Sequence, residues 1–177
     1  MSLFFDLLSA VNNPDQQANV GQLASIMNSV QSLTANRGMQ PNQVQSMMSI
    51  VGNMIRPVLK QQQATIGSGR LENLISQVVA SDASGSALTS LLSPQLMQQI
   101  SEAVTQQTGM SPNLVQSALP TIVRAVLGML QMGAPQTGAW GNSNPLLNSF
   151  LDSDKDSDTD FGDVMKFANR FINPNAA

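Results

Sequence analysis

Hydrophobic residues recur along most of this chain with the spacing of an α-helix, and no segment alternates with the two-residue period of a β-strand. The longest apolar stripe runs from Val44 to Leu59 and places Val, Met, Ile and Leu at intervals of three and four residues. Such a stripe is typical of a helix that packs against a core. The pattern therefore predicts an all-α protein, with helices over residues 2–11, 19–37, 41–66, 71–79, 87–92, 94–108, 112–130, 145–151 and 161–171.

One short motif occurs twice, 71 residues apart. Residues 38–46 read GMQPNQVQS and residues 109–117 read GMSPNLVQS, so seven of nine positions are identical. A glycine can end one helix in a left-handed conformation, and a proline fits the first turn of the next. A binding role for the motif is the alternative, but capping chemistry accounts for nearly every position. We expect two helix hairpins whose methionines fill the corners and whose turns use Gly38, Pro41, Gly109, Ser111 as a capping residue, and Pro112.

The repeat divides the chain into three parts. Residues 1–81 hold the first helical repeat, and residues 87–133 hold the second, with a linker rich in Ser, Asp and Gly over 82–86. Residues 134–177 contain a further linker, an Asp-rich loop and the last helix. A flexible joint is expected at 67–69. This organisation predicts duplicated helix hairpins packed as one multi-helical domain, followed by a short C-terminal helix pair around the Asp-rich loop.

Missing residue types exclude several kinds of chemistry. The chain has no His, no Cys and no Tyr. It therefore lacks disulfides, thiolate zinc ligands, a thiol nucleophile and the usual general base at neutral pH. Asp, Glu and Lys remain for proton transfer, and no glycine-rich phosphate loop or nucleophile elbow is present. We therefore expect no enzymatic activity and no cofactor, apart from the calcium ion considered below.

Charge is concentrated in one segment. Six of the eleven acidic residues lie between Asp152 and Asp163, and with Lys155 they give this stretch a net charge of −5 against −3 for the whole chain. The remaining sequence is nearly neutral and rich in Gln, Ser and Asn. Its basic residues are scattered singly, so no cationic stripe could track a phosphate backbone. Nucleic acid is not an expected partner.

The acidic segment has the ligand spacing of an EF-hand calcium loop, in which positions one, three, five, seven, nine and twelve face the ion. Three positions depart from that pattern. Ser157 replaces the glycine at position six, Thr159 replaces the aliphatic residue at position eight, and an Asp replaces the usual Glu at position twelve. A weak, mainly structural Ca²⁺ site is one interpretation, and a solvated acidic linker is the other. The candidate ligands are Asp152, Asp154, Asp156, Asp158, Asp160 and Asp163.

The amino-terminal segment is apolar on one face but does not resemble a secretory signal, because it lacks a basic start and Asp6 interrupts its apolar run. Cytoplasmic localisation is therefore expected. The side chains of Leu3, Phe4, Leu7 and Leu8 are candidates for a membrane anchor or for a cover over the open end of the helical stack. We favour the cover, because few Lys or Arg residues are available to attract anionic lipid.

The segment 100–130, the residues Leu146-Leu147-Asn148-Ser149-Phe150-Leu151 and the Asp-rich stretch after them resemble the YidB-like family of bacterial proteins, domain of unknown function nine-three-seven. The resemblance implies an all-helical fold without an assigned activity and supplies no catalytic residues. Gln- and Ser-rich helix surfaces and an acidic loop without early glycine depart from the family pattern. We therefore expect a non-catalytic helical module for protein interaction or self-association, with a peripheral membrane protein as the alternative.

Overall fold

The computed structural model describes residues 12, 20–80, 86–134 and 144–152. Within these ranges the chain forms seven helices and no strand, which confirms the all-α prediction. The helices are α2 (Val20–Arg37), α3 (Pro41–Ile66), α4 (Ser68–Ala80), α5 (Ser86–Leu91), α6 (Pro94–Thr108), α7 (Pro112–Gln131) and α8 (Pro145–Asp152).

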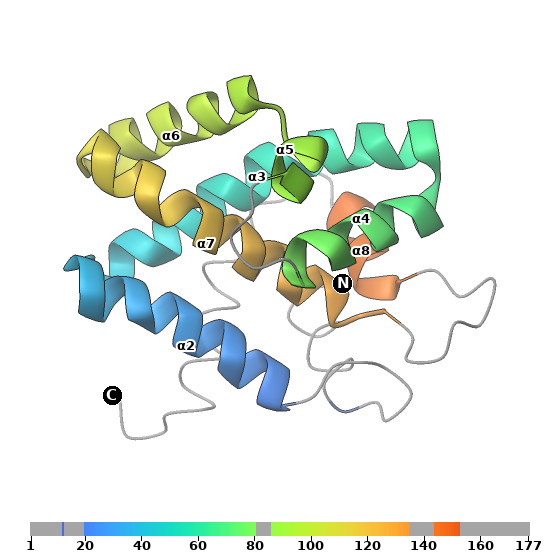
Figure 1. Ribbon diagram of the computed structural model, residues 1–177, viewed down its shortest axis with the longest axis horizontal. Helices are drawn as coiled ribbons and strands as arrows, with labels where there is room; N and C mark the ends of the chain where they lie inside the picture. Colours follow the sequence, from blue (N-terminus) through green and yellow to red (C-terminus); the bar gives the residue numbers. More distant parts are fainter. Residues whose placement is uncertain (1–11, 13–19, 81–85, 135–143, 153–177) are drawn as a thin grey trace.

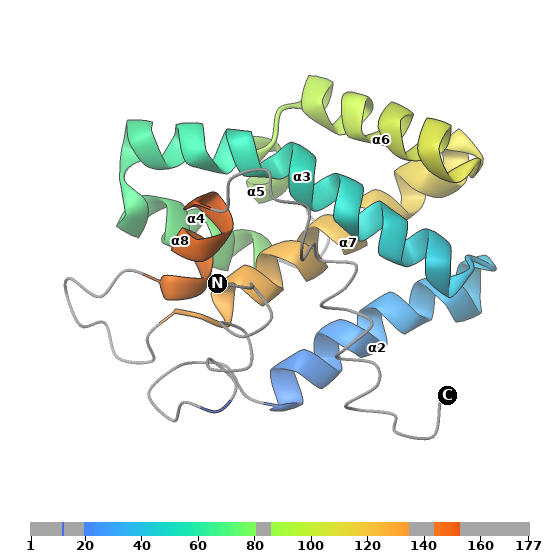
Figure 2. The ribbon, with the colours of Figure 1, turned by 180° about the vertical axis from the view of Figure 1, so that it is seen from behind.

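The two hairpins, α2–α3 and α6–α7, interlock rather than stack as separate layers. Helix α2 packs on α7, helix α3 packs on α6, and α3 and α7 also contact each other. Figures 1 and 2 show α7 in the middle of the molecule, with α2 below it, α6 above it and α3 crossing it. In the repeat with an offset of 71 residues, α6 corresponds to α2 and α7 corresponds to α3. The contact between α2 and α7 is therefore matched by the contact between α6 and α3.

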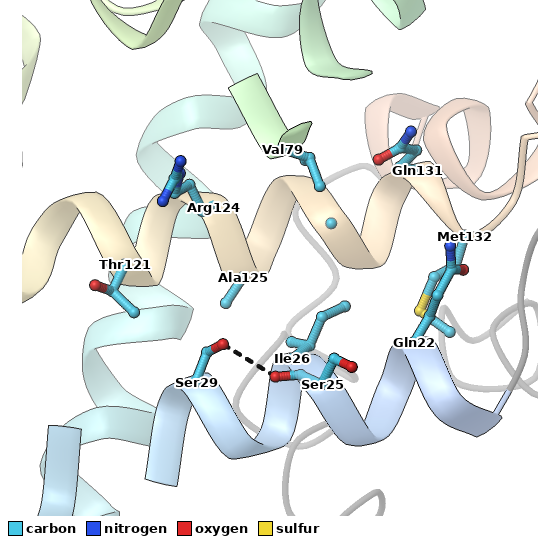
Figure 3. Close-up of a pocket in the computed structure, with 11 residues that line it drawn as sticks. Gln22, Ser25, Ile26, Ser29, Val79, Thr121, Arg124, Ala125, Gln131 and Met132 are labelled. Carbon is cyan, nitrogen blue, oxygen red and sulfur yellow. Dashed lines mark hydrogen bonds between the residues drawn. The ribbon is translucent and has the colours of Figure 1, made fainter. Parts of the chain in front are cut away.

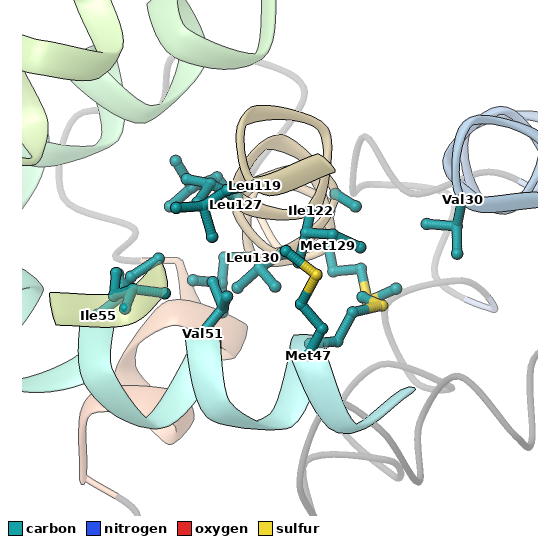
Figure 4. Packing of buried hydrophobic residues seen from close by; sticks show 14 of the residues in the cluster. Val30, Met47, Val51, Ile55, Leu119, Ile122, Leu127, Met129 and Leu130 are labelled. Carbon is teal, nitrogen blue, oxygen red and sulfur yellow. The ribbon is translucent and has the colours of Figure 1, made fainter. Parts of the chain in front are cut away.

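The core follows the same correspondence. Side chains of α3 and α7 point toward one another in Figure 4, and Val30 of α2 approaches from the side. Methionine is prominent in this core, since Met47 and Met48 are fully buried, as expected for a flexible side chain that fills irregular gaps. Several pairs of core residues are 71 positions apart in the sequence, with both members at most 2% exposed. Examples are Val44 and Val115, Val51 and Ile122, Ile55 and Val126, and Leu59 and Leu130.

Both Gly-Met-x-Pro turns have the predicted form. Gly38 and Gly109 adopt positive φ angles of 64° and 68°, which glycine reaches without a steric penalty. The methionines that follow, Met39 and Met110, are buried at the corners of their hairpins. Each turn therefore ends one helix, fills the corner and begins the next helix within four residues.

The prediction that the Ser111 side chain caps α7 is wrong. Ser111 occupies the capping position, but its side chain makes no capping hydrogen bond. The amide of Leu114, which a cap would bind, donates instead to the Ser111 backbone carbonyl at 3.0 Å. In the preceding helix, by contrast, the equivalent amide of Leu96 donates to Ser93 Oγ at 3.3 Å. An early backbone bond in α7 thus replaces the side-chain cap.

The helices α4 and α8 lie beside the interlocked hairpins. Helix α4 packs on α3 and α7, and the short α8 packs on the same two helices from another direction. The predicted joint at 67–69 is narrower than expected, because Ser68 and Gly69 are already part of α4. Gly67 alone separates α3 from α4 and lets the chain fold back.

Candidate functional site

A groove of about 290 Å³ lies along the contact between α2 and α7. Figure 3 shows side chains from both helices facing it, with Val79 of α4 at its upper edge. The lining positions recur every three or four residues on each helix, so the groove follows the helix axes for about two turns. Its sides are formed mainly by Ser25, Ile26 and Ser29 on α2 and by Thr121, Ala125 and Gly128 on α7.

Small side chains create this groove. A Cβ atom on Gly128 would lie 3.3 Å from Ile26 Cδ1, so the two helices are in direct contact at its floor. On either side of that contact, serine and alanine leave space that larger residues would fill. The hydroxyls of Ser25 and Ser29 donate to the carbonyls of Gly21 and Ser25, one turn earlier. The serines therefore keep their hydrogen bonds within α2 and need no partner in the groove.

Polar side chains of α7 attach α4 along one edge of the groove. Arg124 Nε donates to the Val78 carbonyl at 3.4 Å, near the carboxyl end of α4. A cation at that end of a helix interacts favourably with the helix dipole. About two turns further along α7, Gln131 Nε2 donates to Ser76 Oγ at 2.9 Å. These contacts fix the edge formed by α4, so the groove is a stable feature of the packed helices.

Asn144 anchors α8 to the end of α7, and the sequence interpretation missed it. Its Nδ2 donates to the Leu130 carbonyl at 2.7 Å, while its Oδ1 accepts from the amides of Leu146 and Leu147, each at 3.0 Å. The Asn144 amide also donates to Glu72 Oε1 on α4 at 3.1 Å. An Asn directly before a helix-starting Pro is a capping signature, and that pair was the available signal.

A cation–π contact adds a second attachment of α8. The Arg56 guanidinium carbon lies 5.0 Å from the centre of the Phe150 ring, which is 1% exposed. Burial lowers the pKa of Arg56. An arginine pKa begins so high that the side chain stays charged at neutral pH. Helix α8 is therefore held by an apolar ring under a cation and by the Asn144 hydrogen bonds.

Most of the predicted calcium ligands lie outside the described residues. Asp152 is the last residue of α8 and is exposed, whereas Asp154, Asp156, Asp158, Asp160 and Asp163 fall beyond the described range. The candidate anchor residues Leu3, Phe4, Leu7 and Leu8 also lie outside it. The calcium site and the membrane anchor therefore stay predictions.

Acid–base groups are scattered over the described part of the chain. No group of three or more His, Cys, Asp or Glu side chains gathers there. Glu72, Glu102 and Asp152 sit on three different helices. The groove itself offers apolar contact and uncharged hydrogen-bonding groups, together with the single cation Arg124 at its edge. Such a surface can bind a partner by shape, but it presents no paired carboxylates for proton transfer.

Helix α7 is the one described helix that is long and apolar enough to cross a membrane by length and composition. In the structure, 61% of its apolar window is buried among the other helices. A central core helix of a packed domain has the same composition, and α7 is packed in that way against α2, α3, α4 and α6.

No family model, no curated protein and no solved structure matches this chain. The resemblance to the YidB-like family therefore stays a prediction. Evidence about function comes from the groove, the attachments of α8 and the distribution of charge.

Proposed function

We propose that this protein is a non-catalytic helical interaction module that binds a protein partner, or another copy of itself, through the groove between α2 and α7. The observation that carries the proposal is the facing rows of small side chains along two adjacent helices. Rows at every third or fourth position suit the side chains of an added helix, because a helix presents its contacts with the same spacing.

The charge distribution supports a binding role over a catalytic one. Across α2, residues 20–36 carry no charged side chain, and the exposed face is made of Gln, Ser, Asn and Ala. A surface with little charge can approach a partner without a large desolvation cost for ions. It also provides no carboxylates with opposed environments, which acid–base catalysis requires.

A leucine in place of Ser29 should weaken partner binding by filling the groove. Ser29→Leu adds a branched apolar side chain inside the groove while leaving the core intact, so we expect at least about a tenfold loss of affinity for a captured partner. Ser32→Leu is a matched control, because Ser32 is also exposed on α2, also bonds the carbonyl four residues earlier, and lies outside the groove. Affinity capture from the native host, followed by titration of the purified partner, measures both variants. Equal binding by the two would contradict the proposal.

We also propose a weak cation site in the Asp-rich segment that begins at Asp152. The described end of this segment gives physical support, since Asp152 places a negative charge at the carboxyl end of α8, where it opposes the helix dipole. A bound Ca²⁺ would offset that charge and the repulsion among the following aspartates.

Calorimetry tests the cation site directly. Titration with Ca²⁺ should give a binding isotherm with a dissociation constant of about 0.1–1 mM, the range of weak calcium modules. Replacing Asp152 and Asp156 together by Asn should remove the heat because it deletes two of six carboxylates. If millimolar Ca²⁺ produces no heat of binding, the cation site is contradicted and the segment is a solvated acidic linker. Repeating the partner capture in Ca²⁺ and in EDTA shows whether the site controls binding.

The resemblance to the YidB-like family is consistent with this proposal, because that resemblance implies a helical fold with no assigned activity. It contributes no residue to the groove. The proposal therefore depends on the geometry of α2 and α7 and not on the family assignment.

A further inference from the structure

The joint between α3 and α4 has a backbone conformation that belongs almost exclusively to glycine. Gly67 adopts φ 84° and ψ 157°, and residues with a side chain are essentially absent from that region. A Cβ atom on Gly67 would meet nothing within 4 Å, so the constraint comes from the backbone and not from crowding. One residue thus determines that α4 folds back onto α3.

Among the described helices, those that pack most closely on the α2–α3 hairpin come after this joint in the chain. Helix α2 packs on α7, and α3 packs on α4, α6, α7 and α8. Gln63 also reaches across the joint, since its Nε2 donates to Ser68 Oγ at 3.2 Å and to Asn148 Oδ1 at 3.3 Å. A second copy of the chain presents the same partners in the same arrangement.

A helical conformation at Gly67 would join α3 and α4 into one continuous helix. That helix would carry the α2–α3 hairpin away from its own α4–α8 unit, where it could pack on the α4–α8 unit of a second copy. The contacts of the closed monomer and of such a reciprocal dimer are identical outside the joint, which is the condition for exchange of an element between protomers. The conformation at Gly67 then decides between them.

We propose that two copies of this chain exchange their α2–α3 hairpins by straightening at Gly67. The exchange uses the packed faces of α2 and α3 and not the groove, so this inference goes beyond the proposed function. Gly67 favours the closed monomer because glycine tolerates the folded-back conformation and has a low helix propensity.

Gly67→Ala should shift the equilibrium between monomer and exchanged dimer toward the dimer. Alanine disfavours the folded-back conformation and favours the continuous helix, so we expect at least about a tenfold fall in the dimer dissociation constant. Size-exclusion chromatography with light scattering over a range of protein concentrations measures the change. Gly69→Ala is the matched control, because Gly69 already lies within α4 and has open space around it. That control should remain as monomeric as the parent chain. An equal change in the dimer dissociation constant of both variants would show that the conformation at Gly67 does not control the exchange.

A disulfide reports which chain supplies each helix. The protein has no cysteine, so a pair introduced as Ile26→Cys and Gly128→Cys forms without competition. These positions face each other between α2 and α7, since a Cβ atom on Gly128 would lie within 3.6 Å of Ile26 Cγ1. In the parent background the pair should link α2 and α7 of one chain. In the Gly67→Ala background it should give covalent dimers on a non-reducing gel.

A monomeric Gly67→Ala variant with only intramolecular disulfides would overturn the exchange. If circular dichroism shows that this variant does not fold, the parent chain with the cysteine pair is refolded from denaturant at high concentration instead. Intermolecular disulfides then support the exchange, and purely intramolecular ones overturn it. Loss of partner binding in Ser29→Leu is measured separately, so failure of the exchange and failure of the groove proposal are distinguishable.

Discussion

Phe150→Ala should lower the free energy of unfolding by about 4 kcal/mol, because removing a fully buried aromatic ring costs about 3–5 kcal/mol in transfer and cavity terms. Phe150 is 1% exposed and lies between the core and the Arg56 guanidinium. The substitution removes the largest buried side chain of α8 and the partner of the cation together. A loss of that size is a large part of the roughly 5–15 kcal/mol that stabilises a typical domain. Urea unfolding followed by circular dichroism provides the measurement.

Phe150→Leu separates the two contributions at this position. Leucine keeps most of the buried apolar volume but cannot interact with a cation through a ring face, so we expect a loss of about 1–2 kcal/mol. A double-mutant cycle with Arg56→Met, which retains much of the arginine stem, isolates the direct coupling between the two side chains. If Phe150→Ala cost less than about 1.5 kcal/mol, α8 would not pack on α3 and α7 as the structure places it.

The helices and turns could be predicted because local chemistry determines them. The apolar stripe from Val44 to Leu59 reappears as the buried face of α3, and the glycines of the two repeated turns adopt the left-handed conformation that their place in the motif implied. Each of these features depends on a few neighbouring residues. The side-chain cap expected at Ser111 does not form, because the amide of Leu114 donates to the Ser111 backbone carbonyl instead. The local sequence does not indicate this choice of acceptor.

The pairing of the helices was beyond prediction, because apolar stripes on α2, α3, α6 and α7 are chemically alike. The spacing of apolar residues does not predict that α2 contacts α7 or that α3 contacts α6. The groove was missed for a related reason. Ser25 and Ser29 read as ordinary surface residues, and Gly128 reads as a weak point in an apolar helix until Ile26 is seen against it.

Buried polar contacts between distant segments are the hardest features to predict. Asn144 and Glu72 are 72 residues apart, and nothing in either local sequence indicates that one amide meets the other carboxylate. The local part of the Asn144 role, its capping of α8 before Pro145, was within reach of sequence rules. Its bond to the Leu130 carbonyl was not, because that depends on how α8 returns to the end of α7.

Asn144→Ala should destabilise the protein by about 3 kcal/mol. The side chain satisfies the Leu130 carbonyl at the end of α7 and the first amides of α8, and it is 2% exposed. Leaving a buried polar group without its partner costs about 1–3 kcal/mol, and the lost helix cap costs about 1 kcal/mol more. Asn148→Ala, within α8, is the matched control. Its carboxamide is half-buried and accepts a longer bond, 3.3 Å, from Gln63, so we expect a loss within about 1 kcal/mol.

Gly133→Ala should disturb the same anchor from the opposite side. A Cβ atom on Gly133 would collide with Asn144 Oδ1 and Leu146 Cβ, so the side chain of Asn144 must leave its position between α7 and α8. Because both substitutions disturb one set of hydrogen bonds, their costs in the free energy of unfolding should add incompletely in the double variant, while the collision with Leu146 keeps its own cost. Urea unfolding of the two single variants and the double variant measures this coupling. Additive losses would mean that Gly133 and Asn144 act independently, so that Gly133→Ala leaves the Asn144 hydrogen bonds in place.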